Sequence, residues 1–242
     1  MMENRLNNLS IAQSVEQILD NIAKTCALCG RDASDVQLMA VTKTVEAQRV
    51  NEAIHAGVRL LGENRAQELL AKYDDYEKDG VDIHFIGHLQ TNKVRQIVDK
   101  VTMIQSLDSV ALAQEIGRQC EKHDKKMNCL VEVNIGSELS KSGVAPDRLS
   151  DFLGELSGFG RICVRGLMAI PPVSGTDAEK ERYFSGMHKL FVDIRDKKLD
   201  NINMDFLSMG MSDDYLLAIK HGSNLVRLGT RLFGHRDYGP AK

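Results

Sequence analysis

The sequence predicts a single (β/α)₈ barrel, in which eight parallel strands close into a ring, preceded by one extra N-terminal helix. Short apolar runs alternate with segments of helical spacing along all 242 residues, as expected for parallel strands joined by crossover helices. The pattern contains eight strand segments, the number that closes such a barrel. No glycine-rich fingerprint follows the first strand, which makes a doubly wound open sheet the weaker alternative.

The extra helix is expected over residues 6–28, where apolar residues recur at helical spacing before Gly30 ends the segment. Cys26 and Cys29, near its end, have the spacing of a redox or zinc pair. A zinc site needs a second pair of ligands at similar spacing, and the sequence has none. We therefore interpret both as buried helix cysteines and expect no metal site.

The strands are expected as short apolar runs, and all but the last are followed by a helix. The strand segments are 36–41, 58–62, 83–86, 101–105, 128–134, 162–169, 204–208 and 225–228. The helical segments between them are 45–56, 65–76, 92–99, 109–122, 146–156, 178–197 and 213–221. Because no linker, low-complexity tract or strong repeat interrupts this order, residues 1–242 are expected to form one domain.

Composition narrows the class of protein. Hydrophobic residues make up 43% and charged residues 27%, as in ordinary globular proteins. A net charge of −3 argues against a general nucleic-acid or membrane-surface binder. No apolar run reaches the roughly 18 residues that cross a bilayer, and residues 1–18 mix charged with apolar positions, unlike a signal peptide. With an odd count of five cysteines, these features predict a cytoplasmic protein.

Barrels of this class bind ligands at the C-terminal ends of their strands, so the residues after each strand are the candidates. Lys43 follows the first strand, either as a solvated lysine or as a desolvated amine that can attack a carbonyl. Asn64 follows the second, as a helix cap or as an amide in the mouth. His88 follows the third, as a general base or as a hydrogen-bonded histidine without catalytic duty.

The turns after the last two strands indicate an anion site. Residues 208–212 contain two serines and a glycine before a helix, and Gly229 and Thr230 follow the eighth strand. Glycines let backbone N–H groups approach an anion, hydroxyls add donors, and a helix N-terminus adds a favourable dipole. Two ordinary turns are the alternative, but barrels often bind phosphate at these two loops.

Arg227 lies within the eighth strand, two residues before Gly229, and should point inward like it. A buried arginine needs an acceptor, either a carboxylate on a neighbouring strand or a ring nitrogen of a bound cofactor. An amine, a phosphate site and an inward arginine match the aldehyde, phosphate and pyridine nitrogen of pyridoxal 5′-phosphate (PLP).

Six motifs carry a family resemblance over nearly the whole chain. They span residues 40–44 (AVTKT), 62–64 (GEN), 84–93 (HFIGHLQTNK), 166–169 (GLMA), 207–213 (LSMGMSD) and 226–234 (VRLGTRLFG). The chain resembles the pyridoxal phosphate homeostasis proteins (the YggS/PROSC group), whose barrel is similar to the N-terminal domain of alanine racemase. Thr42 stands where serine is often expected, a change that keeps the hydroxyl.

The resemblance implies a set of cofactor contacts. Lys43 would carry PLP as a Schiff base, and Arg227 would face the pyridine nitrogen. The remaining residues that it implies are Ser208, Gly229 and Thr230 at the phosphate, with Asn64 and Met209 near the cofactor.

Chemistry and resemblance favour a carrier over an enzyme. A guanidinium only donates hydrogen bonds, so a pyridine nitrogen facing Arg227 stays unprotonated and the ring is a poor electron sink. Racemases take a second acid/base from an extra C-terminal domain, and the chain ends at Lys242, soon after the eighth strand. We expect a monomer that buffers PLP or delivers it to PLP-dependent apo-enzymes, with no catalytic residues of its own.

Two alternatives stay open from the sequence. One is a small racemase-like enzyme with His88 or a tyrosine as its second base, and the other is a phosphate-sugar enzyme that uses Lys43. The loop over residues 140–143 contains Lys141, which either is solvated or holds a second, looser cofactor molecule.

Overall fold

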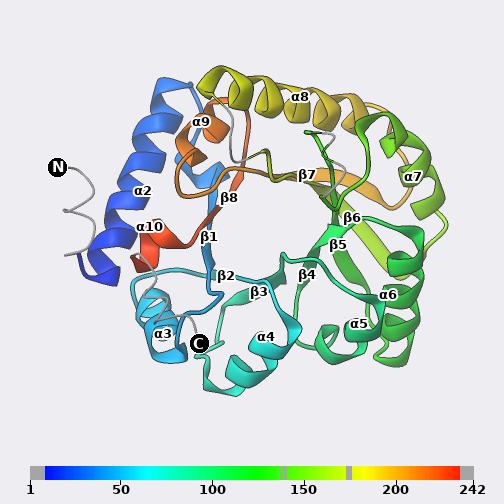
Figure 1. Cartoon of the computed structure of the whole chain (residues 1–242), viewed down its shortest axis with the longest axis horizontal. Helices are drawn as coiled ribbons and strands as arrows, with labels where there is room; N and C mark the ends of the chain where they lie inside the picture. Colours follow the sequence, from blue (N-terminus) through cyan, green and yellow to red (C-terminus); the bar gives the residue numbers. More distant parts are fainter. Residues whose placement is uncertain (1–8, 137, 139–140, 173–175, 235–242) are drawn as a thin grey trace.

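Eight parallel strands close into a barrel in chain order, with β1 paired to β8, in the computed structural model of the chain (Figure 1). The structure describes residues 9–136, 138, 141–172 and 176–234. The strands are β1 (Gln37–Val41), β2 (Leu60–Glu63), β3 (Asp82–Phe85), β4 (Met103–Leu107), β5 (Met127–Glu132), β6 (Ile162–Met168), β7 (Ile202–Ser208) and β8 (Leu225–Leu228). The predicted barrel is confirmed.

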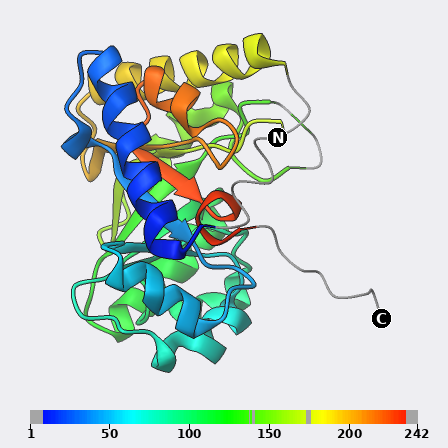
Figure 2. The same cartoon turned by 90° about the vertical axis from the view of Figure 1, so that its left-hand side faces the viewer.

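Helices surround the barrel, and α2 runs along its outside beside α9 and α10 (Figure 2). The α-helices are α2 (Ile11–Leu28), α3 (Ala47–His55), α4 (Ala66–Lys72), α5 (Thr91–Ile97), α6 (Val110–Lys122), α7 (Leu149–Leu156), α8 (Asp177–Arg195), α9 (Tyr215–Lys220) and α10 (Thr230–Phe233). Short 3₁₀ turns are η1 (Ala33–Asp35), η2 (Tyr73–Asp75) and η3 (Pro146–Arg148). No described helix is long and apolar enough to cross a membrane.

The extra helix α2 begins at a reciprocal cap. The Ser10 hydroxyl accepts the Gln13 N–H at 3.2 Å, and the Gln13 side chain accepts the Ser10 N–H at 2.9 Å.

The predictions for this helix are met in part. Residues 6–8 of the predicted helix lie outside the described residues. Cys26 is buried in α2, but Cys29 caps its end and is exposed, so the prediction of two buried helix cysteines is wrong for Cys29.

Element bounds differ from the sequence prediction at several places, of which β4 and the segment after β8 are two. The fourth strand lies two residues further along than 101–105, because the Val101 N–H bonds to the Ile97 carbonyl in the turn that follows α5. A helix, α10, follows the eighth strand where none was predicted. A segment of one turn is too short to show helical periodicity.

Apolar side chains fill both the layer between strands and helices and the inside of the barrel. One interior cluster is formed by Met39, Val41, Leu60, Ile86 and Leu225, and a second by Met103, Leu130 and Met168. Gly62 makes the first cluster possible, because a Cβ there would lie 2.5 Å from the Met39 sulfur. The barrel is a packed core, so ligands must bind at its ends.

Candidate functional site

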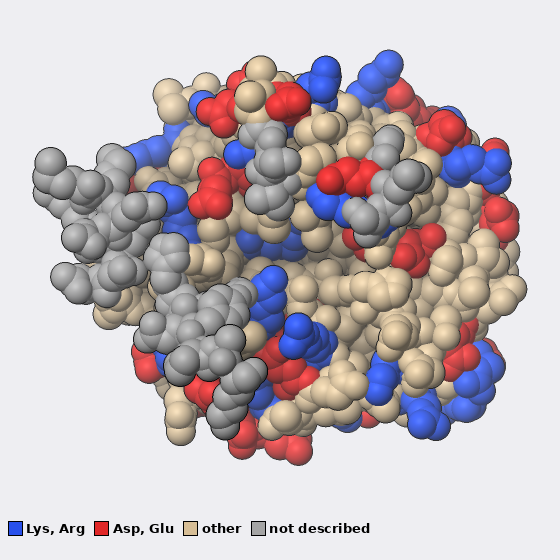
Figure 3. Space-filling model, in the orientation of Figure 1, with Lys and Arg blue, Asp and Glu red and all other residues tan. Residues whose placement is uncertain are grey.

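The C-terminal ends of the strands surround a hollow, with blue Lys and Arg side chains at its centre (Figure 3). Lys43 is half-buried and lies two residues after β1, and Asn64 is half-buried directly after β2. Arg227 lies in β8, and Gly229 and Thr230 lead from β8 into α10. The barrel therefore brings the predicted site residues to one end of the molecule.

Lys43 sits on a turn that is fixed on both sides. Thr42 is fully buried, and its hydroxyl donates to the Glu63 carboxylate at 2.7 Å. Thr44 has φ +60° and donates its N–H to the Glu68 carboxylate. A β-branched residue seldom adopts a positive φ, so this turn is held in place by its surroundings.

A buried polar cluster under the Lys43 turn provides that support. Glu63 is fully buried and accepts hydrogen bonds from the Tyr76 hydroxyl at 2.5 Å and from Thr42. The ammonium of Lys72 lies 3.2 Å from the same carboxylate and donates to the Thr42 carbonyl at 2.9 Å. Burial, then the charge of Glu63, raises the pKa of the Tyr76 hydroxyl. Sequence reasoning missed Lys72 and Tyr76; the only signal was the Gly-Glu-Asn motif that contains Glu63.

Arg227 is buried in the barrel, as predicted from its position in the strand. Its guanidinium donates to the Ser208 hydroxyl at 2.6 Å and to the Ala169 carbonyl at 2.9 Å. Burial lowers its pKa to about 10, while the charges of Glu132 and Asp214 oppose that shift. Arg227 thus remains a cation at neutral pH, and among the described residues it has no carboxylate within ion-pair distance.

Ser208 and Ser212 face different surroundings. Ser208 is fully buried, accepts from Arg227 and donates to Gln105 Oε1 at 2.7 Å. Ser212 is half-buried, and its hydroxyl accepts the Arg231 N–H at 3.3 Å, across the turn after β8. The hydroxyl that lies between the loop after β7 and the loop after β8 is therefore that of Ser212.

Gln105 extends the interior hydrogen bonds to His84, which lies 2.9 Å away through its Nδ1. Both side chains are buried. They occupy inward positions of β3 and β4, and sequence reasoning did not assign them to the site. The signal available in the sequence was a polar residue within each apolar strand segment.

Asn64 and Met209 differ in how they can take part in the mouth of the barrel. The Met209 side chain packs in the main apolar core, so it can offer a ligand at the mouth only its backbone. A Cβ at position 87 would lie 2.1 Å from the Asn64 carbonyl oxygen, so glycine there lets the ends of β2 and β3 approach.

The turn between β7 and α9 requires a glycine. Gly210 has φ +94°, and a Cβ there would meet the Ala218 side chain at 2.6 Å. The predicted helix 213–221 shortens to α9, of six residues, so we assign it no role in anion binding.

Acidic residues at the mouth were not predicted. Glu132 ends β5 half-buried, and burial, aided by Asp108 and opposed by Arg227, raises its pKa to about 7. His88 is exposed, with Nδ1 3.8 Å from the Asp108 carboxylate and 3.3 Å from the Ser142 hydroxyl.

Lys141 is engaged by its own loop. Its ammonium pairs with the Glu138 carboxylate and lies 3.4 Å from the Pro171 carbonyl. Ser140 lies outside the described residues. Among the described side chains, no group of three or more His, Cys, Asp or Glu is placed to hold a metal ion.

The chain is similar to known proteins along most of its length. Residues 14–237 match the family described as the alanine racemase N-terminal domain. The pyridoxal phosphate homeostasis protein of Aquifex aeolicus is 36% identical over 230 residues, covering 95% of this chain and 100% of that protein. The chain belongs to the pyridoxal phosphate homeostasis protein family. The Pasteurella multocida member is 37% identical over 232 residues, covering 95% of this chain and 99% of its own.

A solved structure of a related protein contains the cofactor. PipY of Synechococcus elongatus with PLP bound superposes with a TM-score of 0.77 at 34% identity. The match covers 88% of this chain and 100% of that chain. Both the fold and the cofactor expected from the sequence therefore occur in a similar protein of known structure.

Proposed function

We propose that this chain binds PLP at the C-terminal mouth of its barrel and buffers or delivers it. The observation that carries the proposal is the placement of a half-buried lysine on a fixed turn after β1 and a buried arginine cation in the neighbouring strand β8. Family membership and the PLP-bound PipY structure support the same ligand.

The donor set fits the aldehyde, the pyridine nitrogen and the phosphate of PLP. Lys43 supplies an amine for the aldehyde, and the donor-only guanidinium of Arg227 suits the lone pair of the pyridine nitrogen. For the phosphate we assign the hydroxyls of Ser212 and Thr230 and the backbone at Gly229. Asn64 and the backbone of Met209 border the same space.

We assign Ser208 to Arg227 rather than to the phosphate. Its hydroxyl lies 2.6 Å from the guanidinium and donates in the opposite direction to Gln105, so it fixes the direction in which Arg227 points.

The same geometry favours a carrier. When bound, PLP supplies an electrophilic aldehyde and a ring that withdraws electrons strongly only if its nitrogen is protonated. Arg227 keeps its protons at neutral pH, because its pKa is about 10. It therefore does not protonate the pyridine nitrogen. We therefore infer that the chain holds the cofactor through Lys43 without catalysis. We further propose that it acts as a monomer and transfers PLP to PLP-dependent apo-enzymes. Sizing of the loaded protein and recovery of activity by an added apo-enzyme test these two inferences.

Borohydride trapping tests the binding site. PLP added to the full chain should give a yellow protein, and reduction should leave one pyridoxyl mass on the peptide that contains Lys43. Lys43→Ala should abolish both signals, whereas Lys141→Ala, a matched lysine at the same end, should keep them. A colourless protein, or a label that survives Lys43→Ala, would contradict the proposal.

Glu132 supports a second candidate, a racemase-like enzyme. A carboxyl with a pKa of about 7 can hold or release a proton at neutral pH. Incubation of the loaded chain with single-enantiomer amino acids in deuterated water separates the two functions. Inversion with deuterium at the α-carbon, lost in Glu132→Gln, would favour the enzyme, and no exchange would favour the carrier.

A further inference from the structure

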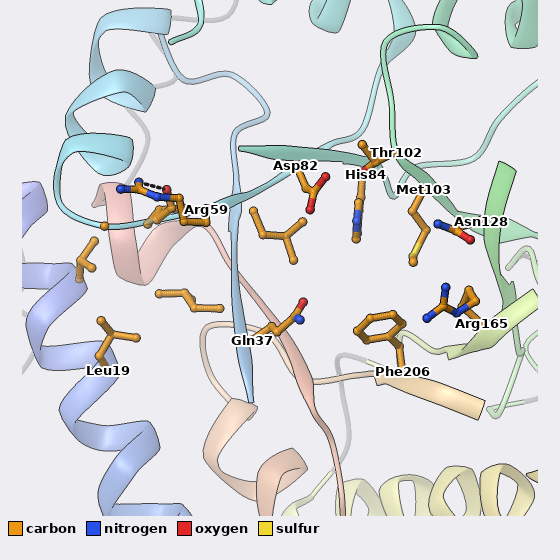
Figure 4. Close-up of a pocket in the computed structure, with 15 residues that line it drawn as sticks. Leu19, Gln37, Arg59, Asp82, His84, Thr102, Met103, Asn128, Arg165 and Phe206 are labelled. Carbon is orange, nitrogen blue, oxygen red and sulfur yellow. Dashed lines mark hydrogen bonds between the residues drawn. The ribbon is translucent and has the colours of Figure 1, made fainter. Parts of the chain in front are cut away.

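A second cavity, of about 470 Å³, lies at the opposite end of the barrel from Lys43. Its wall is built from the starts of the strands, where Gln37, Leu60 and Asp82 are the first residues of β1, β2 and β3. Figure 4 shows side chains from different strands converging on this space. The volume suits a small molecule, and no residue assigned to PLP lines it.

His84 presents a polar atom to this cavity. The side chain is only 5% exposed, and Nδ1 contacts Gln105 at 2.9 Å. Among the described residues no hydrogen bond to Nε2 is present, and the ring points into the cavity in Figure 4. Nε2 is not among the fully buried polar atoms that lack a partner in the described part of the chain, so a molecule in the cavity can reach it.

The hydrogen-bond chain determines which nitrogen of His84 carries the proton. Arg227 can only donate, so Ser208 accepts from it and gives its own proton to Gln105 Oε1. Gln105 Nε2 then donates to His84 Nδ1, which places the ring proton on Nε2. The reverse arrangement of Gln105 would leave the buried Ser208 O–H without an acceptor. Burial lowers the pKa of His84 to about 3, which keeps the ring neutral. His84 thus offers the cavity an N–H donor.

Charged groups lie on two sides of this donor. Asp82 is exposed and, within the described part of the chain, forms no ion pair. Arg165 lies at another side, beside Asn128 in Figure 4; it is 2.5 Å from the Asp205 carboxylate and stands over the Phe206 ring. The Asp82 carboxylate thus shares a small cavity with the neutral side chains of His84 and Asn128 and with Arg165, whose guanidinium already pairs with Asp205.

Part of the remaining wall is apolar, beside the polar residues Gln37, Arg59 and Thr102. Leu19 of α2 is 47% exposed and lines it together with Val15 and the half-buried Leu38. In Figure 4, Leu19 lies at the far side from Arg165. An exposed leucine beside a polar floor provides room for an apolar group attached to a polar one.

We propose that this cavity is a second, non-covalent binding site for a free amino acid with an apolar side chain. The ammonium group would pair with Asp82, the carboxylate would accept from His84 Nε2–H and face Asn128 and Arg165, and the side chain would lie against Leu19 and Leu38. The site is separate from the PLP mouth and does not depend on the proposed function.

Nitrogen NMR of the histidine ring tests the proposal directly. In the full chain with ¹⁵N-labelled histidine, the His84 signal is the one that His84→Gln removes, and we expect its proton on Nε2. L-Leucine should shift this signal saturably, both with and without PLP bound. A proton on Nδ1, or no saturable shift up to about 10 mM leucine, would overturn the proposal.

Variants and analogues test the charges. Asp82→Asn should weaken leucine binding about tenfold or more, as expected for loss of a charged partner, while the matched surface change Asp79→Asn should not alter it. Leucine amide and N-acetyl-leucine, which each lack one charge, should bind more weakly than leucine. Equal affinity of all three ligands, or of both variants, would contradict the assignment. PLP absorbance, read in the same samples, reports the mouth independently.

Discussion

Ser208 at the end of β7 and Ser212 in the turn after it make the assignment of the phosphate site testable at single residues. Ser212→Ala should lower PLP affinity roughly 10- to 100-fold, because a hydrogen bond to a charged group contributes about 1.5–3 kcal/mol. Affinity for pyridoxal, which lacks the phosphate, should not change. Ser208→Ala should lower the affinity for both molecules by similar factors, since it releases Arg227. Absorbance titrations measure all four affinities, and a phosphate-specific loss in Ser208→Ala would reverse the assignment.

Glu132 gives the fold a pH dependence of known sign. Its folded-state pKa of about 7 exceeds the roughly 4.3 of an unfolded glutamate. Folding therefore favours the protonated form, and its contribution is fully present below about pH 4 and is lost as pH rises to about 7. Glu132→Gln, which resembles the protonated form, should be more stable than the natural chain by up to about 3 kcal/mol at pH 8 and equal to it near pH 4.

Urea unfolding at the two pH values measures this difference. Glu155→Gln, on the exposed face of α7, is the control and should show the same stability difference at both. A stability gain of Glu132→Gln that does not change with pH would mean that the carboxyl is not perturbed in the folded state.

At the scale of elements, hydrogen bonds between side chains of β3, β4, β7 and β8 cross the barrel interior. Gln105→Leu should lower the free energy of unfolding by about 1–3 kcal/mol, because Ser208 and His84 would each lose a buried partner. The same change on an exposed face of α6, Gln114→Leu, should stay within about 0.5 kcal/mol.

A double-mutant cycle then tests whether these residues act as a unit. Gln105→Leu and Ser208→Ala together should cost less than the sum of the single changes, by about 0.5 kcal/mol or more. Additive costs would show that the two side chains contribute separately. Denaturant unfolding of the four proteins supplies the measurement.

Elements whose signal is local could be predicted from the sequence. Each strand is a contiguous apolar run, and the rule that ligands bind at strand C-termini places Lys43, Asn64 and Arg227 at one end without knowledge of any contact. Features that depend on contacts between distant segments could not be predicted. The difference between Ser208 and Ser212 depends on how β7 and β8 face each other, and the Glu63–Tyr76 cluster depends on how α4 folds back onto β2.

At the scale of the whole molecule, the two ends of the described chain are joined outside the barrel as well as within it. β1 pairs with β8, and α2 packs against α9 and α10. Arg31, just after α2, donates to the Ile219 carbonyl at 2.7 Å and the Ser223 carbonyl at 2.9 Å. We propose on this basis that residues 1–242 behave as one cooperative domain.

Arg31→Ala tests that cooperativity. Loss of two hydrogen bonds from a charged donor should lower the free energy of unfolding by about 1–3 kcal/mol, which at this chain length lowers Tm by roughly 2–4 °C per kcal/mol. Lys24→Ala, which removes an exposed ion pair of α2, should change it by less than about 1 kcal/mol. In a single domain the buried thiols of Cys26 in α2 and Cys129 in β5 should become reactive at the same denaturant concentration, in Arg31→Ala as in the natural chain. Release of Cys26 well before Cys129 would mean that α2 unfolds independently of the barrel.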